Sequence, residues 1–142
     1  MTLSSESSRK GSAHAGSGTT GPFTESFKFL STSEVKVTKY DSSNNATVLT
    51  GGGTDYTATL INAGLSGISI LLTSALAVGE QLIIEGDTAA VQPTPYRNLG
   101  DFDPVKHETS FDRLTMISQE AKAKANRSVV LNILDDETAI DT

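Results

Sequence analysis

Six short segments between residues 26 and 85 alternate apolar and polar side chains, and turn-forming residues separate each segment from the next. Alternation with a period of two places one set of side chains on a single face of a β-strand. No helical stripe interrupts the segments, so we expect an antiparallel β-sandwich or a barrel-like head instead of parallel βαβ units. The expected strands are 26–30, 34–40, 46–50, 55–61, 67–72 and 81–85.

The segment from Asp41 to Asn45 has the composition of a tight turn, Asp-Ser-Ser-Asn-Asn. Asn and Asp side chains bond to their own backbone and tolerate the left-handed conformation that turns require. Strands 34–40 and 46–50 are therefore predicted to form a hairpin around this turn.

Composition divides the 142 residues into four parts, with a fold that is mainly β and α+β overall. Residues 1–22 are rich in Ser, Gly and Thr and have little apolar surface to offset the entropy of ordering, which predicts a flexible N-terminal arm. A second interpretation is an arm that orders only in the groove of a partner. Residues 23–100 form the expected β-rich head, 101–128 a helix and 129–142 an extended acidic tail.

A single helix is predicted from Pro104 to about Asn126. Asp103 suits the N-cap, and Pro104 suits the first helical position, where its missing N–H leaves no partner unsatisfied. Two alternative phases of the helix carry apolar side chains, one through Phe111, Leu114, Ala121 and Ala125 and the other through Leu114, Ile117 and Ala121. Neither is a strong zipper, because the small residues bury little area, and we expect a weak seam that aligns copies of the chain. The predicted seam residues are Phe111, Leu114, Ile117, Ala121 and Ala125.

Charge and composition exclude several classes of partner. The formal net charge is −6, and the basic residues form no run, so neither nucleic acid nor an anionic membrane is an expected partner. There is no stretch of about 18 apolar residues that would span a membrane. The chain has no Cys, which removes thiolate nucleophiles and Cys-based zinc sites.

No arrangement of side chains typical of catalysis stands out. His14 and His107 are isolated, whereas a metal site needs three or four converging ligands. Gly51 to Thr54 is glycine-rich but lacks the Lys of a phosphate-binding loop and precedes a strand. We therefore expect no catalytic residue, cofactor or metal, and we do not expect an enzyme. A capsid or carbohydrate-binding β module is an alternative function.

The order of short motifs along the chain resembles a known family. The motifs are Phe27 and Phe29, Val35 and Val37, Gly53 with Asp55 to Thr57, Ser74 to Glu80, Leu82 to Glu85, Phe102-Asp103, His107-Glu108, Asp112 to Met116, and Gln119-Glu120. Over about residues 23 to 131, this order resembles the N-terminal, virion-proximal domain of bacteriophage tail fibres and tailspikes, of the kind found on short-tailed coliphages.

The resemblance implies a homotrimer whose β heads dock on the phage tail and whose helices gather on the threefold axis. It implies a virion protein of the tail, assembled in the bacterial host cytoplasm, that anchors a fibre or tailspike for host attachment. The implied partners are tail adaptor, nozzle or portal-proximal proteins, and a separate receptor-binding protein if the anchor stands alone. The candidate partner-binding residues are Arg9, Lys10 and Arg97.

Overall fold

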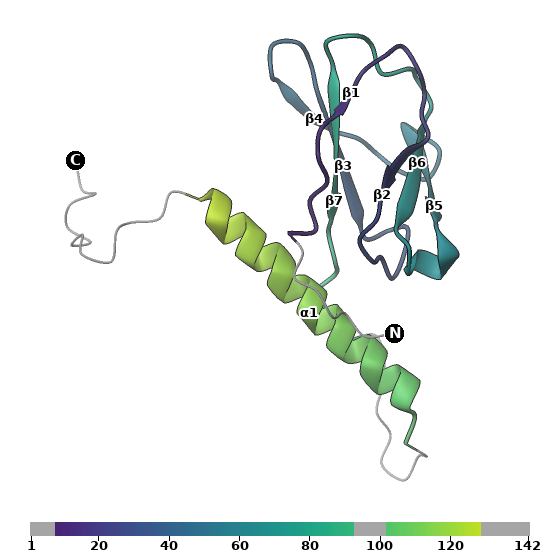
Figure 1. Ribbon diagram of the computed structural model, residues 1–142, viewed down its shortest axis with the longest axis vertical. Helices are drawn as coiled ribbons and strands as arrows, with labels where there is room; N and C mark the ends of the chain where they lie inside the picture. The colour runs from purple at the N-terminus through teal and green to yellow at the C-terminus, as the bar shows by residue number, and fades with distance from the viewer. Residues whose placement is uncertain (1–7, 93–101, 129–142) are drawn as a thin grey trace, which may run out of the picture.

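The computed structural model describes residues 8–92 and 102–128. As predicted, the fold is mainly β with one C-terminal helix, and its strands form two antiparallel sheets with no closed barrel (Figure 1). The elements are β1 (His14–Ala15), β2 (Phe23–Glu25), β3 (Val35–Tyr40), β4 (Ala46–Val48), β5 (Tyr56–Leu60), the 3-10 turn η1 (Asn62–Gly64), β6 (Ile68–Leu72), β7 (Gln81–Gly86) and α1 (Pro104–Arg127).

One sheet has the strand order β1-β7-β3-β4 and the other has the order β2-β6-β5. The long pair β3 and β7 aligns Val35 with Gly86 and Tyr40 with Gln81, so the start of β3 and the end of β7 lie at the same end of the sandwich. The predicted hairpin is confirmed, because β3 pairs with β4 across the turn from Asp41 to Asn45. Asp41 Oδ1 accepts hydrogen bonds from the backbone N–H groups of Ser43 and Asn45.

The core consists of the inward faces of the two sheets. The predicted alternation is confirmed in β6, where Ile68, Ile70 and Leu72 are buried while Leu71 is exposed. The buried cluster comprises Phe23, Phe29, Val35, Val37, Tyr56, Ile68, Ile70, Leu72, Leu76, Leu82 and Ile84. No residue of α1 belongs to this cluster, so the two sheets enclose their own core.

The prediction of a strand at 26–30 is wrong. This segment is irregular, and the edge strand lies just before it at β2, which pairs with β6. Phe29 is buried because its backbone N–H donates to the carbonyl of Gly64, 3.0 Å away, which draws the segment against η1. The rings of Phe27 and Phe29 contact each other with centroids 4.9 Å apart. Alternation alone did not distinguish this paired aromatic loop from a strand.

Residues 8–22 are part of the head and not the predicted flexible arm, although residues 1–7 lie outside the described residues. β1 pairs with the edge of β7, and the N–H groups of Gly11 and Gly16 donate to Ile84 and Glu80 carbonyls, both at 2.8 Å. A side chain on Gly16 would lie 1.8 Å from the Ala77 carbonyl oxygen. The small residues that suggested disorder are therefore those that a close backbone approach requires.

The predicted helix is confirmed from Pro104 and continues to Arg127. Asp103 Oδ1 accepts hydrogen bonds from the N–H groups of Val105 and Lys106, as expected of an N-cap. Figure 1 shows α1 crossing obliquely below the end of the sandwich where β3 begins and β7 ends. No helix in the described part of the chain is long and apolar enough to cross a membrane. The predicted tail, 129–142, lies outside the described residues.

Candidate interaction surface of the helix

One face of α1 is buried against the head. Its buried residues are Asp112, Met116, Glu120 and Ala123, whose spacing of three or four residues places them on one side of the helix. Two of the four are carboxylates. Burying a carboxylate requires a hydrogen-bonded partner, so the contacts of this face are polar to an unusual degree.

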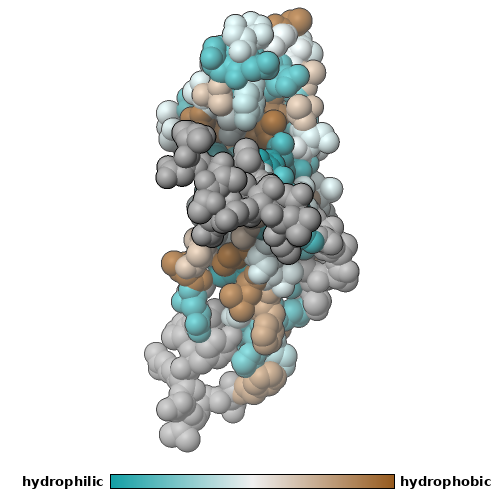
Figure 2. All heavy atoms as spheres, turned by 90° about the vertical axis from the view of Figure 1, so that its left-hand side faces the viewer, coloured by the Kyte–Doolittle hydropathy of each residue, from teal (hydrophilic) through white to brown (hydrophobic). Residues whose placement is uncertain are grey.

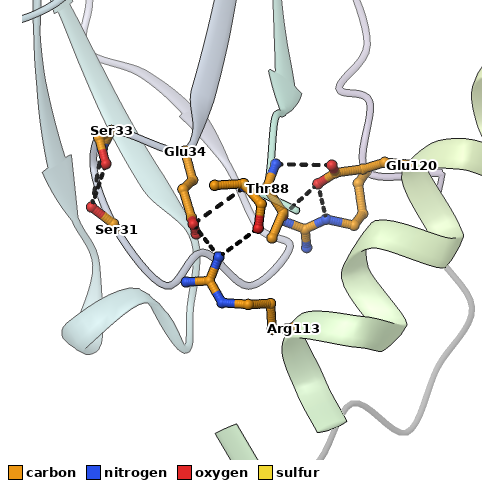
Figure 3. A network of polar contacts seen from close by, with 8 residues as sticks. Ser31, Ser33, Glu34, Thr88, Arg113 and Glu120 are labelled. Carbon is orange, nitrogen blue, oxygen red and sulfur yellow. Dashed lines mark hydrogen bonds and ion pairs between the residues drawn. The ribbon is translucent and has the colours of Figure 1, made fainter. Parts of the chain in front are cut away.

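Glu120 lies at the centre of these contacts (Figure 3). Its Oε1 accepts hydrogen bonds from Arg9 Nε at 2.8 Å and Thr88 Oγ1 at 2.7 Å, and its Oε2 accepts one from the Thr88 backbone N–H at 2.9 Å. Arg9 precedes β1, and Thr88 follows β7. The carboxylate therefore joins the helix to both ends of the head's chain.

Arg9 also makes contacts within the head. Its Nη1 donates to the Lys28 carbonyl at 2.6 Å. Its guanidinium lies over the rings of Phe27 and Phe29, 5.3 and 5.4 Å from their centroids. Arg9 is only 1% exposed. These contacts do not agree with the prediction of Arg9 as a partner-binding residue, because its charge is already engaged inside the chain.

Three further ion pairs connect α1 to the same end of the sandwich. Lys28 pairs with Asp112, both with little exposure. Arg113 pairs with Glu34 and donates to the Ala89 carbonyl at 3.0 Å (Figure 3). The more exposed pair is Arg127 with Glu85, at 3.2 Å. These pairs could not be predicted from the sequence, since the two members of each pair lie far apart along the chain.

The predicted seam residues lie on the face of α1 that turns away from the head. Phe111 and Leu114 are 65% and 61% exposed. Ala121 and Ala125 are also exposed, and Ile117 is half-buried. At about 100° per residue, these positions are centred roughly opposite the face that contains Met116. The structure thus brings the five residues together on one accessible face, while their role between copies stays a prediction.

Next to this face is a hollow of about 700 Å³ between α1 and residues 90–92, with Leu30, Val91, Phe111 and Leu114 among its lining residues. The ring of His107 stacks between Phe102 and Phe111, with centroid distances of 4.5 and 6.4 Å. In Figure 2, hydrophobic and hydrophilic side chains alternate over the lower part of the molecule, where α1 lies. This half of α1 therefore offers a mixed surface rich in aromatic rings.

The other two predicted partner-binding residues are placed differently. Lys10 is exposed beside β7, and its backbone forms an isolated antiparallel β-bridge with that of Glu85. Arg97 lies outside the described residues. Among the described residues, no three His, Cys, Asp or Glu side chains are grouped in a way that could hold a metal ion.

The end of the sandwich opposite α1 carries two carboxylates with shifted titration. The side-chain amide of Asn45, together with backbone N–H groups of the turn, lowers the pKa of Asp41 below its ordinary value of 3.8. The backbone N–H of Ala77, and then Lys39, lowers the pKa of Glu80 below 4.5. Both groups therefore stabilise their turns in the charged form.

Comparison with known proteins identifies a tail spike protein as a relative of this chain. The chain matches no family model. It is 34% identical over 123 residues to the tail spike protein of Salmonella phage epsilon15. The match covers 87% of this chain and 11% of that protein, so the chain spans a small part of its relative's length. This similarity confirms the resemblance to tailspikes that the order of motifs indicated.

Proposed function

Because this chain is a domain related to bacteriophage tail spike proteins, we propose that it is a structural part of the phage tail that anchors a tail fibre or tailspike and so serves host attachment. The observation that carries this proposal is the extent of the match. Nearly the whole chain corresponds to a small fraction of a long tail spike protein. A module of this size suits the attachment of a larger assembly.

In the proposed assembly, three copies associate through the exposed face of α1. Phe111 and Leu114 supply apolar surface near the head, and Ala121 and Ala125 allow close approach of the helices further along. Because the ion-paired face and this exposed face lie on opposite sides of α1, each helix can keep its own head while it contacts its neighbours. The heads would then project outward from the helical axis.

The proposed partners are proteins of the tail, such as an adaptor, nozzle or portal-proximal protein, and a separate receptor-binding protein. The proposed role is structural and requires no catalytic residue. The alternative, a capsid or carbohydrate-binding β module, gains no support from the similarity to a tail spike protein.

A binding experiment tests the anchoring role. The chain would be fused to a fluorescent protein and mixed with particles of its own phage from which the spikes or fibres have been removed genetically. We expect saturable labelling of the tails, and competition by unlabelled chain. The fluorescent protein alone is the control, and labelling no greater than this control would reject the anchoring role.

A further inference from the structure

The contacts that hold α1 to the head differ in kind from those that hold the head together. The core between the sheets is apolar and contains no residue of the helix. The buried face of α1 contributes only Met116 and Ala123 as apolar side chains. The other contacts described above are polar: the ion pairs of Asp112, Arg113, Glu120 and Arg127, and the hydrogen bonds that Thr88 donates to Glu120 and that Arg113 donates to the Ala89 carbonyl.

Such polar contacts define the orientation of α1 on the head but contribute little net free energy to its docking. The attraction within a buried ion pair is largely offset by the loss of water from both charges, whereas buried apolar side chains gain from the same loss. In addition, Oε2 of Glu34 is buried without a hydrogen-bond partner among the described residues. An unsatisfied acceptor at the contact weakens the docking of the helix further.

We propose that α1 is a separable element, which leaves and rejoins the head as a unit while both sheets stay folded. Local opening of this kind occurs in segments with few buried apolar contacts. In the docked state the ion pairs hold one orientation of the helix. In the open state the helix turns relative to the sandwich, which has lost none of its own core.

Gly86 offers a way to disturb the docking without removing a charge. It ends β7, and a methyl group there would lie 2.5 Å from Glu120 Oε1 and 2.9 Å from Arg9 Nε. These atoms are ends of side chains and can move apart, so Gly86→Ala would separate the ion pair. Glu120→Gln removes the charge directly, and Lys124→Gln, at an exposed position of the same helix, serves as the control.

The chain has no Cys, so two introduced cysteines can carry spin labels at chosen positions. Suitable exposed sites are Thr47 on β4 and Asn126 on α1. Labelled chain would be diluted in an excess of unlabelled chain, so that only distances within one copy are measured. We expect a narrow distance distribution for the parent and the control, and a second, broad population for Gly86→Ala and Glu120→Gln.

Hydrogen exchange on the same full-length variants separates opening of α1 from unfolding of the head. We expect the amides of α1 to exchange faster by on the order of tenfold, in line with the loss of a hydrogen bond to a charged group, and those of β3, β6 and β7 to keep their rates. A distribution that stays narrow would show that Met116 suffices to hold the helix and would overturn the proposal. Faster exchange in the core strands, or unfolding of either variant, would overturn it equally.

A detachable helix would allow whatever follows it to tilt relative to a head fixed on the tail. This consequence rests on the proposed function, whereas the separation of α1 from the head does not. A chain that fails to bind tails but shows the second distance population would reject the anchor and keep the separable helix.

Discussion

Arg9 and Glu120 form an ion pair with Nε and Oε1 2.8 Å apart, although 111 residues separate them in the chain. The same guanidinium donates to the Lys28 carbonyl. One side chain thus connects the N-terminal segment, the loop that carries the two packed Phe rings, and the helix. Only a planar group with several donors can serve these directions together.

The first prediction exchanges Arg and Lys at two neighbouring positions. Arg9→Lys should lower the free energy of unfolding by on the order of 1–3 kcal/mol, because a single ammonium group cannot reach both acceptors and leaves one unsatisfied. Lys10→Arg, at an exposed site, should change it by less than about 0.5 kcal/mol. Urea denaturation followed by circular dichroism measures both. Equal changes in the free energy of unfolding for the two variants would show that the contacts of the Arg9 guanidinium do not stabilise the fold.

The second prediction concerns the exposed face of α1. Leu114→Asp should dissociate the proposed trimer, because the contact between helices would bury an unpaired carboxylate. Val78→Asp places the same charge at an apolar loop residue that is 83% exposed and far from the helix, and should leave the assembly intact. Light scattering coupled to size-exclusion chromatography gives the masses. A monomeric parent chain would refute the seam.

The third prediction is a pH dependence at the end of the sandwich opposite α1. Asp41 and Glu80 have lowered pKa values, so each charged group contributes stability above its ordinary pKa, and this contribution is lost as the pH falls through the lowered value. Amide chemical shifts of Asn45 and Ala77 should titrate with midpoints below 3.8 and 4.5 respectively. Asp41→Asn should abolish the first titration and leave the second. Midpoints at or above the ordinary values would contradict the assigned hydrogen bonds.

The fourth prediction is a stabilising substitution in η1. Ala63 has φ 51° and ψ 30°, the left-handed conformation that costs a residue with a side chain about 1 kcal/mol relative to Gly. Ala63→Gly should therefore raise the free energy of unfolding by about that amount. Ala58→Gly in β5 should lower it by roughly 0.5–1 kcal/mol, because it loosens a strand. Thermal unfolding measures the stability of both variants. A less stable Ala63→Gly variant would contradict the inferred backbone strain at Ala63.

The sequence was sufficient wherever local periodicity decides the outcome. In β6 the spacing of Ile68, Ile70 and Leu72 at every second residue determines which face is buried, since neighbouring side chains on a strand point to opposite sides. The N-cap at Asp103 is similarly local. These features need no knowledge of the rest of the chain.

What could not be predicted depends on partners that are distant in sequence. Asp112 and Glu120 are residue types that usually lie on an exposed helical face. They can be buried here because they pair with Lys28 and Arg9, which are 84 and 111 residues away in the sequence. The segment at 8–22 has the composition of a flexible arm. It is ordered because its backbone forms hydrogen bonds along the edge of β7 and with residues at the end of β6. The grouping of the predicted seam residues on one face of α1 followed from the pattern, whereas the ion-paired face did not.

The position of the N-terminal segment at the sheet edges also determines when the domain can be completed during synthesis. Residues 8–25 emerge from the ribosome before their partners in β6 and β7, and Arg9 can form its ion pair only after Glu120 has been synthesised. A nascent chain that has not reached Gln81 lacks the strand between β1 and β3, so both would present unpaired edges to other chains. The sandwich therefore closes in a late step, and an interruption of translation within this domain would leave an aggregation-prone fragment instead of a smaller folded one.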